Sequence, residues 1–102
     1  MSQLRYWVWL ASVDGVRPIT LCRMAEHFGG PMEAYFALEE RLDVIDGITP
    51  QERKLLADRN LERTERILAV CQQKGIRILT LNDASYPDRL RQIADPPLVL
   101  YV

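Results

Sequence analysis

The sequence predicts a mainly α-helical domain followed by the incomplete start of an α/β domain. Two observations divide the 102 residues in this way. Up to residue 74, apolar residues recur at intervals of three and four and are separated by Gly and Pro, which is typical of short amphipathic helices. From residue 75 onward, the runs IRILTL and LVLYV favour strands. We therefore expect a helical domain at 1–74 and a strand–helix–strand segment at 75–102.

Prolines and glycines mark the ends of the first helices. Residues 4–12 are rich in apolar and aromatic side chains and predict a short helix. Pro18 and Pro31 each suit the first turn of a helix, because the N–H that proline lacks has no partner there. The helix from Pro18 should end at Gly29, with His27 in its last turn, and the helix from Pro31 should extend to residue 42.

A single long helix is expected at 50–74. Thr49 and Glu52 have the spacing of a capping box, and Pro50 is a natural first residue. An apolar stripe follows, and Gly75 ends the helix. Positive and negative side chains are interleaved on the rest of its surface. That mixture is more typical of a solvated face with i,i+4 ion pairs than of a binding stripe.

The last part of the chain is interpreted as two strands around a short helix. This helix should be capped by Ser85 and should contain Pro87 in its first turn. The flanking strands are nearly continuous apolar runs, as in sheets that are covered on both faces. Because two strands alone do not make a stable sheet, we expect the chain to be the front part of a larger protein.

Composition and charge disfavour several functional classes. The net charge of −1 provides no overall basic field that would attract nucleic acid. Cys22 and Cys71 are expected to be small buried residues, and His27 has no ligand cluster around it. No apolar segment is long enough for a membrane span, and the N-terminus lacks the features of a signal peptide. With no nucleophile–base pair in the sequence, we expect a cytoplasmic protein that is not an enzyme and uses no metal or cofactor.

Two similar stretches, SVDGVRPITL and VIDGITPQER, place a glycine turn just before a helix. The backbone N–H groups and the dipole at a helix N-terminus can hold a phosphate. In this way helix-hairpin-helix modules bind a nucleic-acid backbone without reading its sequence. The candidate DNA contacts are the backbone amides near Gly15 and Gly47, supported by the cations Arg17, Arg23 and Lys54.

The same stretches also suit a purely structural role. Glycine eases a tight turn, and proline starts the next helix. Asp14 and Asp46 place negative charge beside the two turns, and Arg17 stands where a DNA-binding hairpin usually has a second glycine. On these residues alone the structural role is favoured. Trp7 and Trp9 are likewise favoured as core anchors over stacking partners for bases.

Taken together, these segments resemble the N-terminal part of the DNA-processing protein A family, also called DprA or Smf. The resemblance covers almost the whole chain, from YWVWLASVDG to the final LVLYV. Its most specific part is a set of residues in the last segment: Tyr86, Pro87, Leu90, Ile93, Asp95, Pro96, Pro97, Leu100 and Tyr101.

The resemblance implies a function that the composition does not show. Proteins of this family bind and protect incoming single-stranded DNA during competence and natural transformation, and they help to load the RecA recombinase for DNA recombination. Their small front domain is sterile-alpha-motif-like with helix-hairpin-helix character. It precedes a Rossmann-type domain that carries most of the DNA binding and the dimerisation surface.

By this resemblance, residues 1–74 are the front domain, an accessory module of the mediator. Residues 75–102 are a dangling first segment of the Rossmann-type domain. Single-stranded DNA, bound mainly by the Rossmann-type domain, and RecA are then the partners, and the resemblance allows a homodimer of the full-length protein.

Two other functional classes stay open. In one, the helical domain is a protein-interaction module that docks a partner or its own Rossmann-type domain through an apolar face, without contact to DNA. In the other, the chain begins a nucleotide-binding α/β enzyme. Salt separates the first class from a DNA-binding role, because binding to phosphate weakens steeply as salt is added, whereas apolar docking hardly changes.

Overall fold

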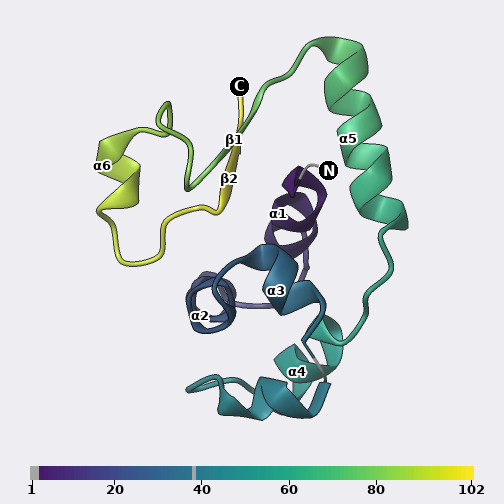
Figure 1. The fold of residues 1–102 in the computed structure, drawn as a ribbon, viewed down its shortest axis with the longest axis vertical. Helices are drawn as coiled ribbons and strands as arrows, with labels where there is room; N and C mark the ends of the chain where they lie inside the picture. The colour runs from purple at the N-terminus through teal and green to yellow at the C-terminus, as the bar shows by residue number, and fades with distance from the viewer. Residues whose placement is uncertain (1–2, 38) are drawn as a thin grey trace.

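The computed structural model describes residues 3–37 and 39–102. The chain is mainly helical with one small sheet, as the sequence predicts (Figure 1). The elements in order are α1 (Leu4–Ala11), α2 (Pro18–Phe28), α3 (Pro31–Tyr35), the 3₁₀ helix η1 (Glu39–Val44), α4 (Pro50–Leu56), α5 (Glu62–Lys74), β1 (Ile78–Thr80), α6 (Asp88–Arg91) and β2 (Val99–Tyr101).

Helix α1 lies in the middle of the molecule and contacts α3, α5 and β2 (Figure 1). Its residues 6–10 are all buried, because this helix is apolar on nearly every side. Trp7 and Trp9 are 8% and 3% exposed, which confirms them as core anchors. The core that includes α1 also contains apolar side chains from distant parts of the chain, among them Met24, Leu56 and Leu98.

The predicted helix starts are confirmed. Pro18, Pro31 and Pro50 each occupy the first turn of their helices. Gly29 ends α2 with a φ of +88°, a left-handed conformation that favours glycine. Local sequence chemistry therefore accounts for where these helices begin and where α2 ends.

The single helix expected at 50–74 is wrong, because the chain forms two helices, α4 and α5, with an irregular stretch between them (Figure 1). Side chains within this stretch replace the helical hydrogen bonds. Asp58 Oδ1 accepts the N–H of Asn60 at 3.1 Å, and Asn60 Oδ1 accepts the N–H of Glu62 at 2.8 Å. Such local acceptors compete with the helical pattern and start the next helix. The break turns α5 so that it packs along α1.

The helix expected at 31–42 is also shorter than predicted. It ends at Tyr35, and the chain then forms η1, which begins at Glu39; residue 38 lies outside the described residues. Leu42 and Ile45, three residues apart, are buried, while Val44 is 56% exposed. The tighter 3₁₀ spacing at η1 agrees with this burial at an interval of three.

The two strands form where the sequence predicts them and pair antiparallel. The register joins Ile78 to Tyr101, Leu79 to Leu100 and Thr80 to Val99. A Rossmann-type domain is built from parallel strands, so this pair does not by itself show one. The proposed boundary between 1–74 and 75–102 stays a prediction.

The cap predicted for the short helix α6 is wrong. Helix α6 begins at Asp88 with Pro87 at the N-cap position, so Ser85 lies outside the helix. Asp83 instead organises the turn before it. Its Oδ2 accepts the N–H of Thr80 at 2.8 Å, and its backbone carbonyl accepts the N–H of Tyr86 at 3.1 Å.

The prediction of a dangling C-terminal segment is also wrong. Leu98 and Val99 are 4% and 8% exposed and belong to the same core as the helices. Tyr86 is buried, and its hydroxyl donates to the carbonyl oxygen of Pro97 at 2.7 Å. The thiol of Cys22 in α2 contacts the carbonyl oxygen of Pro96 at 3.6 Å. Residues 75–102 therefore pack on the helical part rather than extend away from it.

Candidate nucleic-acid interface

The two glycine turns form as predicted, one before α2 and one before α4. Gly15 has a φ of +84° and Gly47 a φ of +78°, so both positions favour glycine. Each turn lies against the helix that follows the other turn: the Gly15 turn lies against α4, and the Gly47 turn lies against α2. A Cβ atom on Gly15 would stand 2.9 Å from Cδ1 of Leu55, and a Cβ on Gly47 would stand 2.9 Å from Nη1 of Arg23.

A buried carboxylate, that of Glu52, lies between the N-termini of α2 and α4. Its Oε2 accepts the backbone N–H of Arg17 at 2.9 Å, the hydroxyl of Thr20 at 2.9 Å and Nε of Arg17 at 3.1 Å. Its Oε1 accepts Nη2 of Arg17 at 2.9 Å and the backbone N–H of Thr49 at 3.1 Å. Thr49 Oγ1 accepts the Glu52 N–H at 3.0 Å, which confirms the predicted capping box.

This arrangement keeps Glu52 ionised. The hydrogen bond from the Arg17 guanidinium, supported by the N–H and O–H donors, lowers the pKa of the carboxyl well below its usual range, although burial works in the opposite direction. The Glu52 side chain is only 4% exposed. A negative charge of the protein itself therefore stands where the amides at the start of α2 and α4 would otherwise meet a phosphate.

The arginines predicted as DNA contacts hold the two turns together. Arg17 Nη2 also donates to the carbonyl oxygen of Gly47 at 2.6 Å, and Arg23 Nη1 donates to the carbonyl oxygen of Asp46 at 2.6 Å. The Lys54 side chain is exposed on α4 and makes no hydrogen bond or ion pair with any residue that the structure describes. The structure thus brings Arg17, Arg23 and Gly47 into one network and leaves Lys54 apart from it.

Sequence reasoning missed the second role of Glu52. The capping-box spacing identified it as a local cap of α4, and that interpretation is correct. Its partner Arg17 lies 35 residues away, so no spacing rule could pair them. The signal available was the proline-led helix start at each turn, which provides unpaired N–H groups that need an acceptor.

The charged residues of the 50–74 region form ion pairs with other elements, whereas the sequence suggested i,i+4 pairs within one helix. Arg63 Nη1 contacts Asp14 Oδ2 at 2.7 Å, and Arg53 Nε contacts Asp43 Oδ1 at 3.1 Å. Glu65 of α5 pairs with Arg5 of α1. The partners of these pairs are substantially exposed, so each pair contributes little stability.

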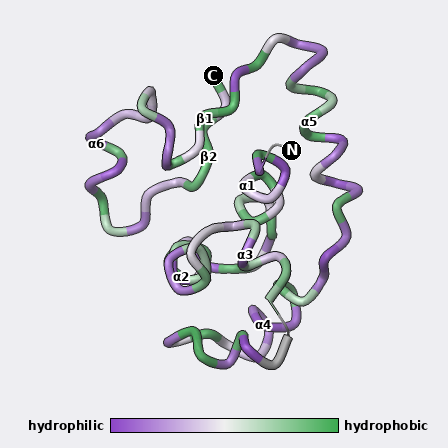
Figure 2. Tube along the Cα trace, in the orientation of Figure 1, coloured by the Kyte–Doolittle hydropathy of each residue, from purple (hydrophilic) through white to green (hydrophobic). Residues whose placement is uncertain are grey.

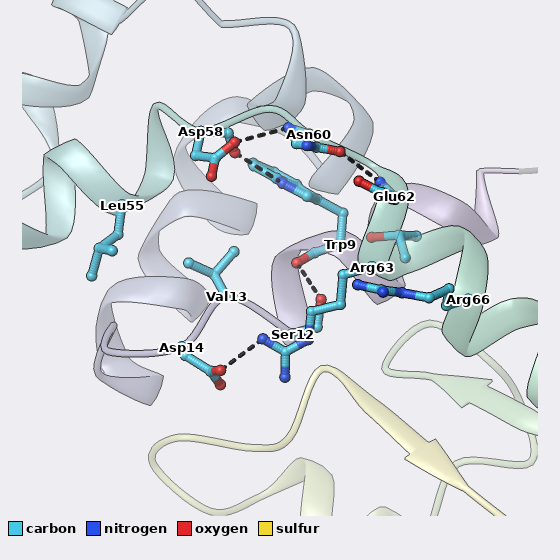
Figure 3. A pocket seen from close by; sticks show the side chains of 11 residues that line it. Trp9, Ser12, Val13, Asp14, Leu55, Asp58, Asn60, Glu62, Arg63 and Arg66 are labelled. Atoms are coloured by element: carbon cyan, nitrogen blue, oxygen red, sulfur yellow. Dashed lines mark hydrogen bonds and ion pairs between the residues drawn. The ribbon is translucent and has the colours of Figure 1, made fainter.

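Two cavities flank the start of α5. The first holds about 300 Å³ and lies between the end of α1, the irregular stretch 57–61 and α5 (Figure 3). Trp9 forms one wall, with its Nε1–H 3.4 Å from the carbonyl oxygen of Asp58, while the Asp14–Arg63 pair lies at another side (Figure 3). Three carboxylates, those of Asp14, Asp58 and Glu62, line this cavity.

The second cavity, here called the α5 groove, holds about 550 Å³ between α5 and the strands. Hydrophobic and hydrophilic residues alternate along α5 (Figure 2). Ile67, Val70 and Cys71 are spaced three and four residues apart, so one side of the helix is apolar. The groove is lined by that side, by two arginines and by residues next to or within the strands: Arg63, Arg66, Ile67, Val70, Cys71, Ile76 and Tyr101.

Metal-binding and membrane-spanning features are not found in the described part of the chain. Within residues 3–37 and 39–102, no group of three or more His, Cys, Asp or Glu side chains could hold a metal ion. No helix there is long and apolar enough to cross a bilayer. Cys22 and Cys71 are buried free thiols, and burial raises the pKa of the Cys22 thiol.

The chain is similar to protein Smf of Synechocystis sp. (strain ATCC 27184 / PCC 6803 / Kazusa), with 35% identity over 101 residues. The match covers 98% of this chain but 25% of that protein, so the chain spans about a quarter of the length of this relative. No protein-family model matches the chain, and no solved structure matches it. The similarity agrees with the family resemblance seen in the sequence.

Proposed function

We propose that this chain is the N-terminal module of a DNA-processing protein of the DprA/Smf family that acts in natural transformation. The observation that carries the proposal is the similarity to Smf over 98% of the chain, through both the helices and the strand segment. A complete protein of this kind binds and protects incoming single-stranded DNA and helps to load RecA onto it. The module itself performs no chemistry.

The packing supports a positioning role for the module. Leu98 and Val99 are buried in the helical core, and Tyr86 ties the turn before α6 to the segment before β2. A sheet that continued from these strands would therefore be held in a fixed orientation relative to α1. We propose that the helices orient a Rossmann-type domain that carries most of the DNA binding.

The two glycine turns support a fold with helix-hairpin-helix character. Arg17, which follows the first turn, donates hydrogen bonds to Gly47 in the second turn and to Glu52, 35 residues away. This network joins the two turns and the helices that follow them. Because the Glu52 carboxylate already receives the amides at both helix starts, Lys54 is the predicted contact that we expect to meet a phosphate. Gly15, Gly47, Arg17 and Arg23 would then support DNA binding by shaping the turns.

The test is complementation in a naturally transformable bacterium from which its own Smf protein has been deleted. The protein that carries this chain, expressed in that strain, should restore the frequency of chromosomal transformants. A version without residues 3–74 should restore it only in part, since the orientation of the sheet is then lost.

Uptake of labelled DNA serves as the control and should be equal in all strains, because the proposed role follows uptake. Immunoblots establish equal protein levels. No recovery of transformants by the complete protein, at normal uptake and normal protein level, would overturn the proposed function.

A further inference from the structure

We propose that the α5 groove binds single-stranded DNA, with the phosphates at Arg63 and Arg66 and a base against Tyr101. This inference rests on the proposed function and adds a contact surface within this chain. It differs from the hairpin contacts predicted from the sequence. The second hairpin lies at the start of α4, which Thr49 caps, whereas the groove lies along α5.

The charge of the groove is complementary to a phosphate backbone. Two of its seven lining residues are arginines and none is a carboxylate, although the chain as a whole carries a net charge of −1. The Arg66 side chain is exposed and makes no hydrogen bond or ion pair with the residues that the structure describes. A phosphate at Arg66 therefore has to displace only water.

Arg63, the second cation, is held only weakly by its present partner. It pairs with Asp14 (Figure 3). The Arg63 side chain is 55% exposed, and the side chain of Asp14 is 81% exposed. Ion pairs at this exposure are weak and are screened by salt. A DNA strand carries several adjacent phosphates, and one of them can replace the single Asp14 carboxylate as the partner of Arg63.

The remainder of the groove offers the apolar faces that unpaired bases need. Tyr101 is 48% exposed at the end of β2, and Val70 is 44% exposed on α5. Ile67 and Ile76 line the same groove. Proteins that bind single strands without reading sequence combine cations along the backbone with an aromatic side chain on which a base stacks. Double-stranded DNA keeps its bases stacked inside and would leave this apolar surface uncovered.

The other candidate surfaces are less suited to a phosphate. At the glycine turns, the Glu52 carboxylate occupies the amides at the helix starts. In the cavity beside Trp9, the carboxylates of Asp14, Asp58 and Glu62 would repel an anion. Arg63 and Arg66 line this cavity as well as the α5 groove, but of the three surfaces the α5 groove is the one without a lining carboxylate.

The test is fluorescence anisotropy of a labelled oligothymidylate titrated with the 102-residue chain over a series of salt concentrations. The chain should bind at low salt and lose affinity as salt rises. Arg66→Gln should reduce the slope of log affinity against log salt by about 0.7, the value for one phosphate contact on a single strand. Tyr101→Ala should weaken binding by roughly 5- to 150-fold, whereas Tyr101→Phe should bind like the unchanged chain.

One control and one comparison variant separate the groove from other surfaces. The control, Arg89→Gln, removes an exposed cation of α6 that lies outside the groove, and Lys54→Gln removes the exposed cation near the second glycine turn, where the proposed function expects a phosphate contact. Circular dichroism should show all variants folded. The inference is overturned if the chain binds no oligothymidylate at low salt, or if the Arg66 and Tyr101 variants bind as tightly as the Arg89 control.

A result in which Lys54→Gln alone weakens binding would also overturn the inference, since it would assign DNA to the glycine turn. If the groove bound an apolar protein segment instead, the chain would not bind oligothymidylate in this way. Binding of that segment would hardly depend on salt. Each of these outcomes leaves the proposed function standing, because the complementation test decides it without reference to the groove.

Discussion

The substitution Glu52→Gln should destabilise the fold strongly, because it removes a buried charge without changing the size of the side chain. The two carboxylate oxygens accept hydrogen bonds from Arg17, Thr20 and Thr49. In glutamine one of these oxygens is replaced by an NH₂ group, which would face N–H or O–H donors instead of accepting from them. The starts of α2 and α4 would then lose hydrogen bonds through which the Glu52 side chain connects them.

The magnitude follows from the burial of the pair. Removing one partner of a buried ion pair costs about 3–5 kcal/mol. The Arg17 side chain is 52% exposed, so water replaces part of what it loses, and we expect a loss near 3 kcal/mol, the lower end of that range. Since a domain of this length is stable by about 5–15 kcal/mol, the variant should keep a marginal fold. The corresponding fall in Tm is roughly 12–24 °C.

Urea unfolding followed by tryptophan fluorescence measures this loss, because Trp7 and Trp9 are buried in the folded state and become exposed on unfolding. Glu65→Gln is the matched control. It makes the same chemical change at a half-exposed carboxylate that pairs with Arg5 on the surface, and it should cost less than about 1 kcal/mol. The reasoning is refuted if Glu52→Gln costs no more than Glu65→Gln.

The pH dependence gives a second signature of the same charge. The folded pKa of Glu52 is lowered, so its contribution is complete above the unfolded pKa and is lost as pH falls through the folded pKa. The unfolded value for Glu is about 4.3. The stability gap between the unchanged chain and Glu52→Gln should therefore be full at neutral pH and should shrink progressively below about pH 5. A gap that stayed constant into acid would show that packing, not charge, makes the difference.

Two further pairs of substitutions test the turns and the C-terminal segment by thermal unfolding. Gly15→Ala should cost more than Gly75→Ala: both residues have positive φ, which costs about 1–2 kcal/mol for alanine, but only Gly15 has a side chain of α4 within 2.9 Å of the new Cβ. Equal losses would contradict the close approach. Leu98→Ala should cost about 2–5 kcal/mol, because Leu98 is 4% exposed. Ile93→Ala, at a residue that is 49% exposed, should stay within about 0.5 kcal/mol, and a Leu98 variant as mild as this one would show that 75–102 does not share the core.

The features that the sequence predicted well depend on neighbours a few residues apart. Proline has no N–H to lose at a helix start, so Pro18, Pro31 and Pro50 mark three helix starts without knowledge of the rest of the fold. The capping box needs only Thr49 and Glu52, which are three residues apart. The apolar runs that form β1 and β2 were likewise visible as segments, although their antiparallel pairing was not.

The break between α4 and α5 was within reach of local reasoning but was hidden by the apolar stripe. Leu61 and Thr64 continue the helical spacing across the irregular stretch, so periodicity alone joins the two helices. Asp58 and Asn60 carry the opposite signal, since their side chains accept N–H groups two residues ahead. Periodicity indicates which residues would share the apolar face of a helix. It does not indicate whether the backbone stays helical between those residues.

The remaining features depend on contacts between distant residues. Nothing near Arg17 in the sequence indicates that Glu52 will stand beside it, and nothing near Leu98 indicates that it will join the core of the helices. The sequence supplied a basic residue and an apolar one, and tertiary packing decided what each contacts. The candidate site was affected in the same way, because a cation binds DNA most readily where the fold has given it no partner or only a weakly held, exposed one.

This difference in partners also sets the relative cost of binding a phosphate at the two places. At the glycine turns, a phosphate would have to displace the Glu52 carboxylate from the amides of Arg17 and Thr49, and would lose the hydrogen bonds that this carboxylate accepts there. At Arg66 it would displace water alone. The hairpin that looks best for DNA in the sequence is therefore the more costly site in the folded chain, and the arginine that looked like part of a solvated face is the less costly one.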